Sequence, residues 1–180
     1  NHVGFCLGPR INAAGRIGNA KKGVEMLTAR SEEKAQEIAL YLENENKKRR
    51  KIQNDILASA KKKILEQMDV KSVKVIIISG DSWHPGVIGV VASRLVGEYY
   101  RPVIIISTEG DVGHGSARSI PGFHLYDALE ECEKAFPDKK LLISYGGHSQ
   151  AAGLRILKKD VPEFTKRFCD VASEYLRSED

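Results

Sequence analysis

The feature that most constrains this chain is a stretch from Ser31 to Met68 that contains neither glycine nor proline. Apolar residues recur through it at helical spacing: Ala35, Ile38, Leu42, Ile52, Ile56, Ala60 and Ile64. Ser31 is followed by Glu32 and Glu33, which favours a helix start, because a hydroxyl caps the first N–H groups and acids suit the first turn. A single helix here would be roughly 55 Å long at about 1.5 Å per residue, too long for one small domain to cover.

The centre of this stretch, from Glu43 to Lys51, is almost wholly polar. A helix that packs one side on a core keeps an apolar stripe, and this segment has none. We therefore expect residues 31–69 to form a connector helix that crosses solvent between two domains. Two shorter helices with a break near Asn46 are the alternative, since polar runs often mark turns.

After Lys71 the pattern changes to alternating strands and helices. Strands are expected at residues 73–79, 102–107, 112–119, 141–145 and 154–157, and helices at residues 87–99, 125–135 and 162–176. The first strand, helix and strand predict a βαβ unit with buried strands. The predicted fold is α/β: a long connector helix followed by a compact mixed-sheet α/β domain with flanking helices, over residues 70–180. Phe5 to Ala20 reads as a loop, with helix after Ala20.

Composition sets broad limits. Of 180 residues, 42% are hydrophobic, which allows a packed core, and the formal charge of +4 is too mild to identify a partner. Cys6, Cys132 and Cys169 are far apart in the sequence, so neither a disulfide framework nor a zinc site is expected. We therefore expect the protein to be located in the reducing cytoplasm. No apolar run approaches the roughly 20 residues of a membrane span, so no membrane partner is expected.

The first glycine-containing segment is G-P-R-I-N-A-A-G-R, from Gly8 to Arg16. Its small residues allow another backbone to approach closely, and Arg10 and Arg16 offer planar guanidinium groups that suit phosphate, with the Asn12 amide between them. An ordinary interdomain loop with solvated arginines is the alternative, and the local chemistry does not decide between the two.

The second segment is G-H-G-S-A-R-S, from Gly113 to Ser119. Ser116, Arg118 and Ser119 supply two hydroxyls and a guanidinium within four residues. In an extended segment Ser116 and Arg118 lie on the same face, as one bound phosphate requires. The alternative is an edge strand with its polar side in water, and the flanking glycines favour phosphate.

The third segment, Y-G-G-H-S-Q-A-A-G-L, follows a predicted strand. Gly146 and Gly147 leave backbone N–H groups approachable by an anion, and His148 beside them offers a donor. A lone histidine is more often structural, but this position favours function. We expect Ser116, Arg118 and His148 to surround one anion-sized space.

The fourth segment, D-S-W-H-P-G-V-I-G, also follows a strand, and His84 is assigned to ligand binding there. Trp83 is expected to pack in the protein rather than stack on a base.

Hydrolysis by two metal ions needs carboxylates and histidines that converge on the ions. The chain has no D-x-D motif and no adjacent histidine pair. We therefore predict no metal ligand and no catalytic residue in this chain, with His148 at most an accessory group.

Four segments, in this order, resemble the RecJ-type exonucleases of the DHH phosphoesterase superfamily: L-G-P-R-I-N-A-A-G-R, S-W-H-P-G-V-I-G-V-V-A-S-R-L, G-S-A-R-S-I-P-G-F and Y-G-G-H-S-Q-A-A-G-L. The resemblance covers nearly the whole chain. It implies a 5′-to-3′ exonuclease specific for single-stranded DNA, acting in DNA repair and recombination. It also implies Mn²⁺ or Mg²⁺ held by an upstream DHH domain of the same polypeptide, outside this chain.

The resemblance further implies a division of the chain. Residues 1–30 would be the end of the DHH domain with the arginine loop, residues 31–69 the connector and residues 70–180 the DHH-associated C-terminal domain. The chain would bind single-stranded DNA but be inactive alone, as a piece cut from a longer protein.

Individual roles follow from the same resemblance. Arg10 and Arg16 would lie near the entrance of a channel for the strand, and Ser116 and Arg118 would bind phosphate near the 5′ end. The segment Gly146 to His148 would face the metal site. Alternatives are a relative that hydrolyses short RNAs or cyclic dinucleotides, and an RNA-recognition module like that of alanyl-tRNA synthetases. A protein-interaction role is a further alternative.

Overall fold

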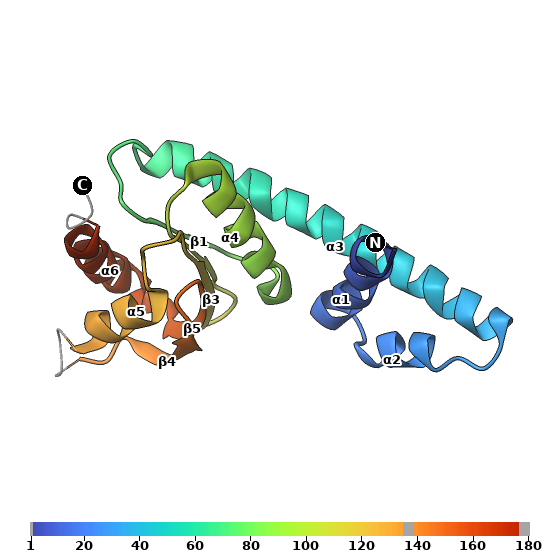
Figure 1. Ribbon diagram of the computed structural model, residues 1–180. Coiled ribbons are helices and arrows are strands. Elements are labelled where there is room, and N and C mark those ends of the chain that lie inside the picture. The colour runs from blue at the N-terminus through green and yellow to red at the C-terminus, as the bar shows by residue number, and fades with distance from the viewer. Residues whose placement is uncertain (1, 135–138, 177–180) are drawn as a thin grey trace. The chain divides into compact units, whose positions relative to one another are not determined.

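The computed structural model describes residues 2–134 and 139–176 (Figure 1). The chain forms two compact units, Asn1–Asp55 and Ile56–Asp180. Helix α3 (Glu32–Gln67) supplies residues to both units. The predicted boundaries at residues 30 and 69 concern the domains of a longer protein, which the division into compact units does not test. These boundaries therefore stay a prediction.

All the secondary-structure elements described in the first unit are helices. It contains a π-helical turn η1 (Val3–Leu7), α1 (Gly8–Ile17), α2 (Lys21–Leu27) and the first part of α3. The predicted loop from Phe5 to Ala20 is therefore wrong. Pro9 lies near the start of α1, directly after η1. Ala13 and Ala14 are buried, so the small residues that suggested a loop serve close helix packing instead.

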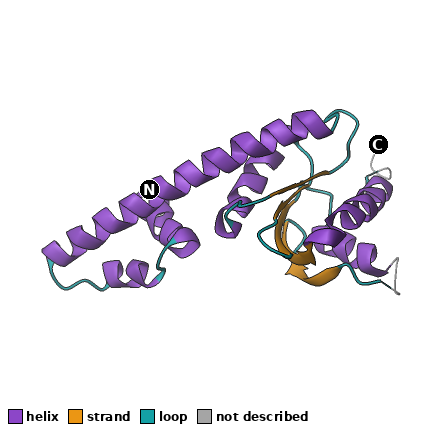
Figure 2. Ribbon diagram, turned by 180° about the vertical axis from the view of Figure 1, so that it is seen from behind, coloured by secondary structure: helices purple, strands orange, loops and turns teal. Residues whose placement is uncertain are grey.

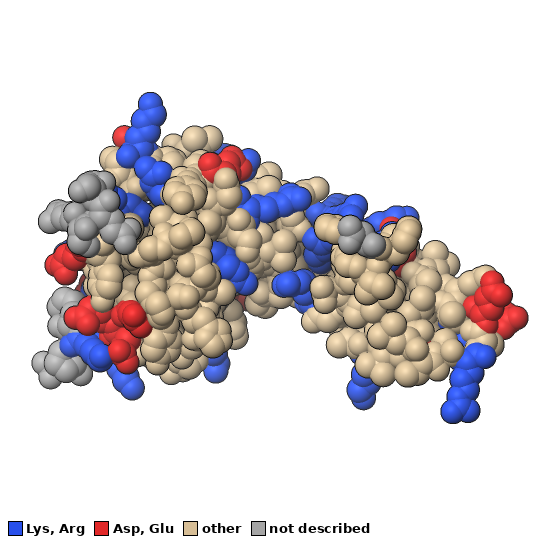
Figure 3. Space-filling view, in the orientation of Figure 1, with Lys and Arg blue, Asp and Glu red and all other residues tan. Residues whose placement is uncertain are grey.

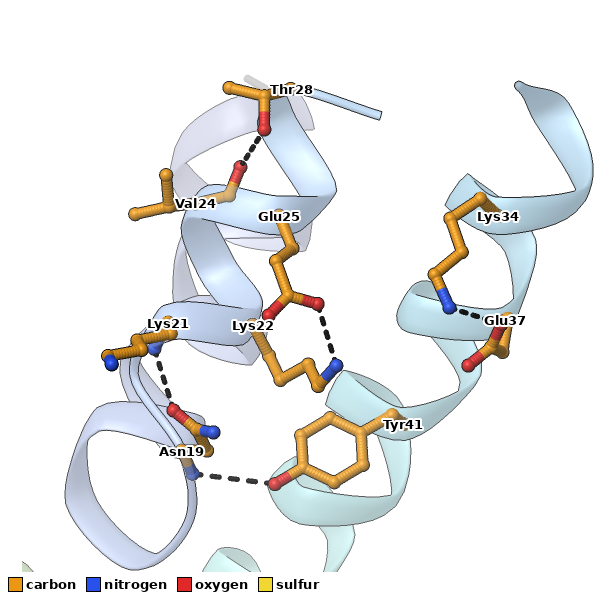
Figure 4. A network of polar contacts seen from close by, with 9 residues as sticks. All are labelled: Asn19, Lys21, Lys22, Val24, Glu25, Thr28, Lys34, Glu37 and Tyr41. Carbon is orange, nitrogen blue, oxygen red and sulfur yellow. Dashed lines mark hydrogen bonds and ion pairs between the residues drawn. The ribbon is translucent and has the colours of Figure 1, made fainter. Parts of the chain in front are cut away.

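Polar contacts hold α2 together and join the turn that precedes it to α3, as Figure 4 shows. The Asn19 backbone N–H donates to the Tyr41 hydroxyl at 3.4 Å, and Lys22 pairs with Glu25 at 2.6 Å. The hydrogen bond to Glu25 raises the pKa of the Lys22 ammonium. Because each lysine drawn in an ion pair has its own carboxylate, this network stabilises structure and is not an anion site.

Helix α3 is continuous from Glu32 to Gln67, so the alternative of a break near Asn46 is wrong. The Ser31 hydroxyl accepts from the Lys34 backbone N–H at 3.3 Å, which confirms the predicted cap. The polar centre is partly buried: Glu45 and Asn46 are buried, as is Gln53 beyond it, but most of the segment is exposed, so a crossing through solvent between two domains stays a prediction. Arg49 donates to the side chains of both Asn46 and Gln53, which satisfies these buried amides locally.

The second unit contains a five-stranded mixed sheet with strand order β1-β2-β3-β5-β4. Its elements are β1 (Ile76–Gly80), α4 (Pro85–Tyr99), β2 (Val103–Ser107), β3 (Val112–Arg118), α5 (Leu125–Lys134), β4 (Leu142–Gly147), β5 (Ala151–Leu157), a 3-10 turn η2 (Lys158–Asp160) and α6 (Val161–Tyr175). Strands β1 and β2 are parallel and joined by α4, and the other pairs are antiparallel. The predicted α/β fold and its βαβ unit are confirmed.

The two faces of this sheet differ. One face packs against α5 and α6 through a core that includes Ile104, Ala117 and Ile156 with Phe164 and Phe168. The other face receives α4, which packs on β2 and β3. The sheet therefore lies between helices (Figure 2). On this second face, α4 covers β2 and β3, whereas β5 and β4 carry exposed residues. The candidate site lies on the same face.

The three cysteines are free thiols, as expected. Burial, with a smaller contribution from the neighbouring Glu133 carboxylate, raises the pKa of the Cys132 thiol to about 12. Burial also raises the pKa of Cys169. Neither group is therefore suited to act as a thiolate nucleophile near neutral pH. Within the described ranges, none of the helices combines the length and the hydrophobicity that a bilayer crossing requires.

Candidate nucleic-acid interface

A cavity of about 400 Å³ opens beside the start of α4, over strands β3, β5 and β4. Its residues are Pro85, Ile88, His114, Gly115, Ser116, Ser144, Tyr145, Gly146, Gly153, Leu154 and Arg155. Among these described lining residues there is no Asp or Glu. The volume is in the range of sites for small ligands.

The floor of this cavity is bare backbone. The strand register places Ser116 next to Gly153 and Gly153 next to Gly146, so the three form a row across β3, β5 and β4. A Cβ at Gly146 would have no atom within 4 Å, and one at Gly153 would have only the Gly115 carbonyl oxygen, at 3.9 Å. The two glycines therefore leave open space that a flat or bulky ligand can enter.

Basic groups lie on the same side of the sheet. His114 on β3 is directly paired with Arg155 on β5, and both are exposed and line the cavity. The Arg155 side chain makes no hydrogen bond or ion pair with another residue in the described part of the chain. An arginine, a histidine and no lining carboxylate make this cavity attractive to anions.

Ser116 and Arg118 form the second polar group. The Arg118 Nη1 donates to the Ser116 hydroxyl at 3.2 Å and to the Ala117 carbonyl at 2.7 Å. Their shared face follows from strand alternation, as the sequence predicted. Ser116 lines the cavity, and Arg118, which is not among the described lining residues, adjoins the cavity through its hydrogen bond to Ser116.

A second cavity, of about 190 Å³, is less suited to an anion. The Asp81 carboxylate accepts from the Lys158 ammonium at 2.8 Å and the Thr108 hydroxyl at 2.7 Å, and these bonds lower the pKa of Asp81. Lys158 is therefore neutralised locally. Elsewhere the charges are dispersed: on the face drawn in Figure 3, Lys and Arg side chains form no single continuous patch. The first cavity is the stronger site.

Residues 70–174 match the DHHA1 domain family. The chain belongs to this family. Over 180 residues this DHHA1 chain is 37% identical to the single-stranded-DNA-specific exonuclease RecJ of Bacillus subtilis, covering 99% of the chain and 22% of the relative. It is also 37% identical to RecJ of Haemophilus influenzae, over 98% of the chain and 31% of the relative. The chain thus spans less than a third of these relatives.

Solved structures agree. The crystal structure of RecJ with Mg²⁺ from Thermus thermophilus superimposes with a TM-score of 0.83 at 33% identity. The match covers 96% of the DHHA1 chain and 26% of the Thermus thermophilus chain. A structure of exonuclease RecJ bound to manganese gives a TM-score of 0.78 at 32% identity. The match covers 96% of the DHHA1 chain and 41% of the chain in that structure. The predicted resemblance to RecJ-type exonucleases is confirmed.

The metals in those structures have no matching donor set here. No group of three or more His, Cys, Asp or Glu side chains among the described residues of the DHHA1 chain can hold a metal ion. The ligands present therefore do not fit a divalent cation.

Of the three side chains that were expected around one space, only Ser116 is among the described residues that line the cavity. Arg118 adjoins it through its hydrogen bond to Ser116, and exposed His148 lies in the β4–β5 turn. Its backbone N–H donates to the Ala151 carbonyl at 2.8 Å, and Ala151 pairs with Arg118. His148 is thus at the same end of the sheet as Arg118, with β5 between them.

Two other predicted residues of the DHHA1 domain have internal partners. Ser119 is buried and its hydroxyl donates to the Phe123 carbonyl at 2.7 Å, which corrects its assignment to phosphate binding, because its O–H is occupied. His84 precedes α4, and its Nδ1 accepts from the Gly86 N–H at 3.1 Å, a cap for that helix. Trp83 is buried, as expected of a packing residue.

The arginines of the first segment lie on α1 and do not converge. Arg10 pairs with Glu43 at 2.6 Å and donates to the Cys6 carbonyl at 2.5 Å. Arg16 is six residues further on, which puts it on a different side of the helix, whereas Asn12 and Arg16 are one turn apart and both exposed. Arg10 is therefore held within its own unit, and the two arginines cannot clamp one phosphate.

The sequence did not reveal three contributors to the site. His114, Arg155 and Gly89 were assigned no role. A Cβ at Gly89 on α4 would lie 2.9 Å from the Ser116 hydroxyl and 3.0 Å from Nη2 of Arg118, so glycine lets α4 approach this pair closely. Strand alternation would have grouped His114 with Ser116 and Arg118, but only the register shows that Arg155 lies opposite His114.

Proposed function

We propose that this chain is the strand-binding part of a longer, metal-dependent exonuclease that degrades single-stranded DNA from its 5′ end in repair and recombination. The observation that carries the proposal is the carboxylate-free cavity, with its bare glycine floor beside Ser116 and Arg118. The names of the RecJ relatives support the same substrate class. The free thiols fit a cytoplasmic location.

Phosphate recognition is assigned to Ser116 and Arg118. A guanidinium and a hydroxyl on one face offer charge-assisted hydrogen bonds to a phosphate at the 5′ end. The open floor at Gly146 and Gly153 then accommodates a nucleoside. Asn12 and Arg16 on α1, and Gly146 to His148 in the β4–β5 hairpin, are proposed as further strand contacts.

Hydrolysis requires groups that the described residues do not bring together. We assign the Mn²⁺ or Mg²⁺ ions and the catalytic groups to an upstream DHH domain of the same polypeptide, because the chain spans only 22% to 31% of the first two relatives. The chain alone is expected to bind single strands without cleaving them.

The test compares ligands of the 180-residue chain. Binding of a 5′-phosphorylated single strand, a duplex, a transfer RNA and a cyclic dinucleotide would be measured by fluorescence anisotropy. The single strand should bind best. Its affinity should fall about tenfold between about 50 and about 200 mM salt, as for two or three phosphate contacts.

The other outcomes identify the alternatives. Preference for transfer RNA would indicate an RNA-recognition module, and preference for the cyclic dinucleotide a phosphodiesterase of short substrates. Equal affinity for the duplex and the single strand would contradict the proposal. In the longer polypeptide, hydrolysis that starts at the 5′ end is expected.

The contact of α4 with the phosphate-binding pair gives a further prediction. Gly89→Ala should raise helix stability by about 0.5 kcal/mol, since alanine is the better helix former. Its Cβ should displace Ser116 and Arg118, because the close atoms belong to movable side chains. Affinity for the 5′-phosphorylated strand should fall about fivefold, less than for loss of a whole charge-assisted hydrogen bond.

Gly97→Ala on the same helix is the matched control, because a Cβ at Gly97 would have no atom within 4 Å. It should raise the free energy of unfolding by about 0.5 kcal/mol and leave the affinity unchanged, whereas the displacement of Ser116 and Arg118 offsets part or all of this gain in Gly89→Ala. Equal affinities of the two variants would show that Gly89 has no part in placing Arg118.

A further inference from the structure

Two polar positions of the cavity follow one another along the paired strands β3 and β5. Ser116 is paired with Gly153, and two residues earlier on β3 His114 is paired with Arg155. These positions share the α4 side of the sheet, because side chains alternate along a strand. At about 3.3 Å per residue they are roughly 6.6 Å apart.

The pair His114 and Arg155 has no evident structural purpose. Both side chains are exposed, and the Arg155 guanidinium has no hydrogen bond or ion pair with any residue in the described ranges. His114 carries a ring N–H donor whether neutral or protonated. Two donors directly opposite on neighbouring strands, one of them a cation, are favoured when an anion binds between them.

We infer that His114 and Arg155 form a second phosphate site, which binds the phosphate that follows the 5′-terminal one. The inference rests on the proposed function and deepens it. The terminal phosphate lies at Ser116 and Arg118, and the next one at His114 and Arg155. The sugar and base between them occupy the space over Gly153 and Gly146, beside Pro85 and Ile88 of α4.

This arrangement makes the cavity a site for one nucleotide unit with a phosphate at each end. A mononucleotide reaches only the first phosphate site, whereas a dinucleotide with a 5′ phosphate reaches both. The second phosphate should therefore raise affinity about tenfold, as one charge-assisted contact does. It should also steepen the dependence of log K on log salt by about 0.7.

The test is an amide-shift titration of the isotope-labelled chain by NMR, which measures weak binding and locates it. The probes are thymidine 5′-monophosphate and the 5′-phosphorylated thymidine dinucleotide. The dinucleotide alone should shift the amides of His114 and Arg155, and both probes should shift that of Arg118.

Arg155→Gln is the test variant and Lys159→Gln the control. Lys159 is also exposed, and it is not among the described residues that line either cavity. Arg155→Gln should reduce the tenfold advantage of the dinucleotide to about twofold, and it should lower mononucleotide affinity by no more than about twofold, because the mononucleotide loses only general attraction to the Arg155 charge. Lys159→Gln should keep the advantage. The amide spectrum reports directly whether each variant is folded.

The outcomes separate this inference from the proposed function. Shifts at Arg118 with both probes but none at His114 and Arg155 would overturn the second site alone. Equal dinucleotide affinities for Arg155→Gln and Lys159→Gln would do the same. Absence of shifts at Arg118 with either probe would overturn the proposed function, and the second site with it.

Discussion

Gly147→Ala should lower the free energy of unfolding of the α/β unit by about 3 kcal/mol or more, because backbone strain and overpacking each cost about 1–3 kcal/mol. Gly147 has a φ of +150°, which side-chain-bearing residues rarely adopt. A Cβ there would lie 2.4 Å from the Ala151 carbonyl oxygen and 2.5 Å from the Ala152 Cα. These are backbone atoms of β5, so the clash cannot be relieved by a rotamer change, and the β4–β5 hairpin must shift.

Gly146→Ala is the matched control in the same hairpin. A Cβ at Gly146 would have no atom within 4 Å, so the free energy of unfolding should change by about 0.5 kcal/mol or less, as for ordinary surface substitutions. Urea unfolding followed by circular dichroism would measure both variants. Equal destabilisation would show that the close backbone approach at Gly147 is not what requires glycine.

The sequence predicted the α/β unit well because β1 and β2 are continuous apolar runs and the other strands alternate or lie between glycines. The strand β2, expected at residues 102–107, is Val103–Ser107, and β3, expected at residues 112–119, is Val112–Arg118. The shared face of Ser116 and Arg118 was also predictable, since the alternation of a strand is a local property. Ser119 was misassigned because β3 ends one residue before it, and its hydroxyl turns inward to Phe123.

Other parts depended on distant residues. Arg155 lies opposite His114 only through the β3–β5 register, and that pairing joins residues 41 positions apart, which no periodicity reports. The same is true of Gly89, whose contact with Arg118 depends on how α4 packs on β3. The helix α1 was taken for a loop because its glycines, Pro9 and Asn12 are typical of turns, whereas Ala13 and Ala14 favour a helix and are buried by its packing.

Arg118→Gln should reduce the affinity for a 5′-phosphorylated single strand by roughly 10- to 100-fold, as loss of a hydrogen bond to a charged group predicts. The affinity for the same strand with a 5′ hydroxyl should change little, because the proposed contact is with the terminal phosphate. Arg118 also donates to Ser116 and to the Ala117 carbonyl, so the free energy of unfolding should fall by about 1 kcal/mol. The effect on binding would therefore exceed the effect on folding.

Arg94→Gln is the matched control for this substitution. Arg94 is exposed on α4, and its side chain has no hydrogen bond or ion pair with another described residue, so its loss removes the same charge without touching the cavity. Affinities of both variants for the phosphorylated and hydroxyl strands form a thermodynamic cycle that isolates the terminal phosphate. Equal losses for the two strands would mean that Arg118 acts through general charge, and the 5′ end would then be recognised elsewhere. A loss confined to the phosphorylated strand would locate recognition of the 5′ end at Arg118, since general charge acts on both strands alike.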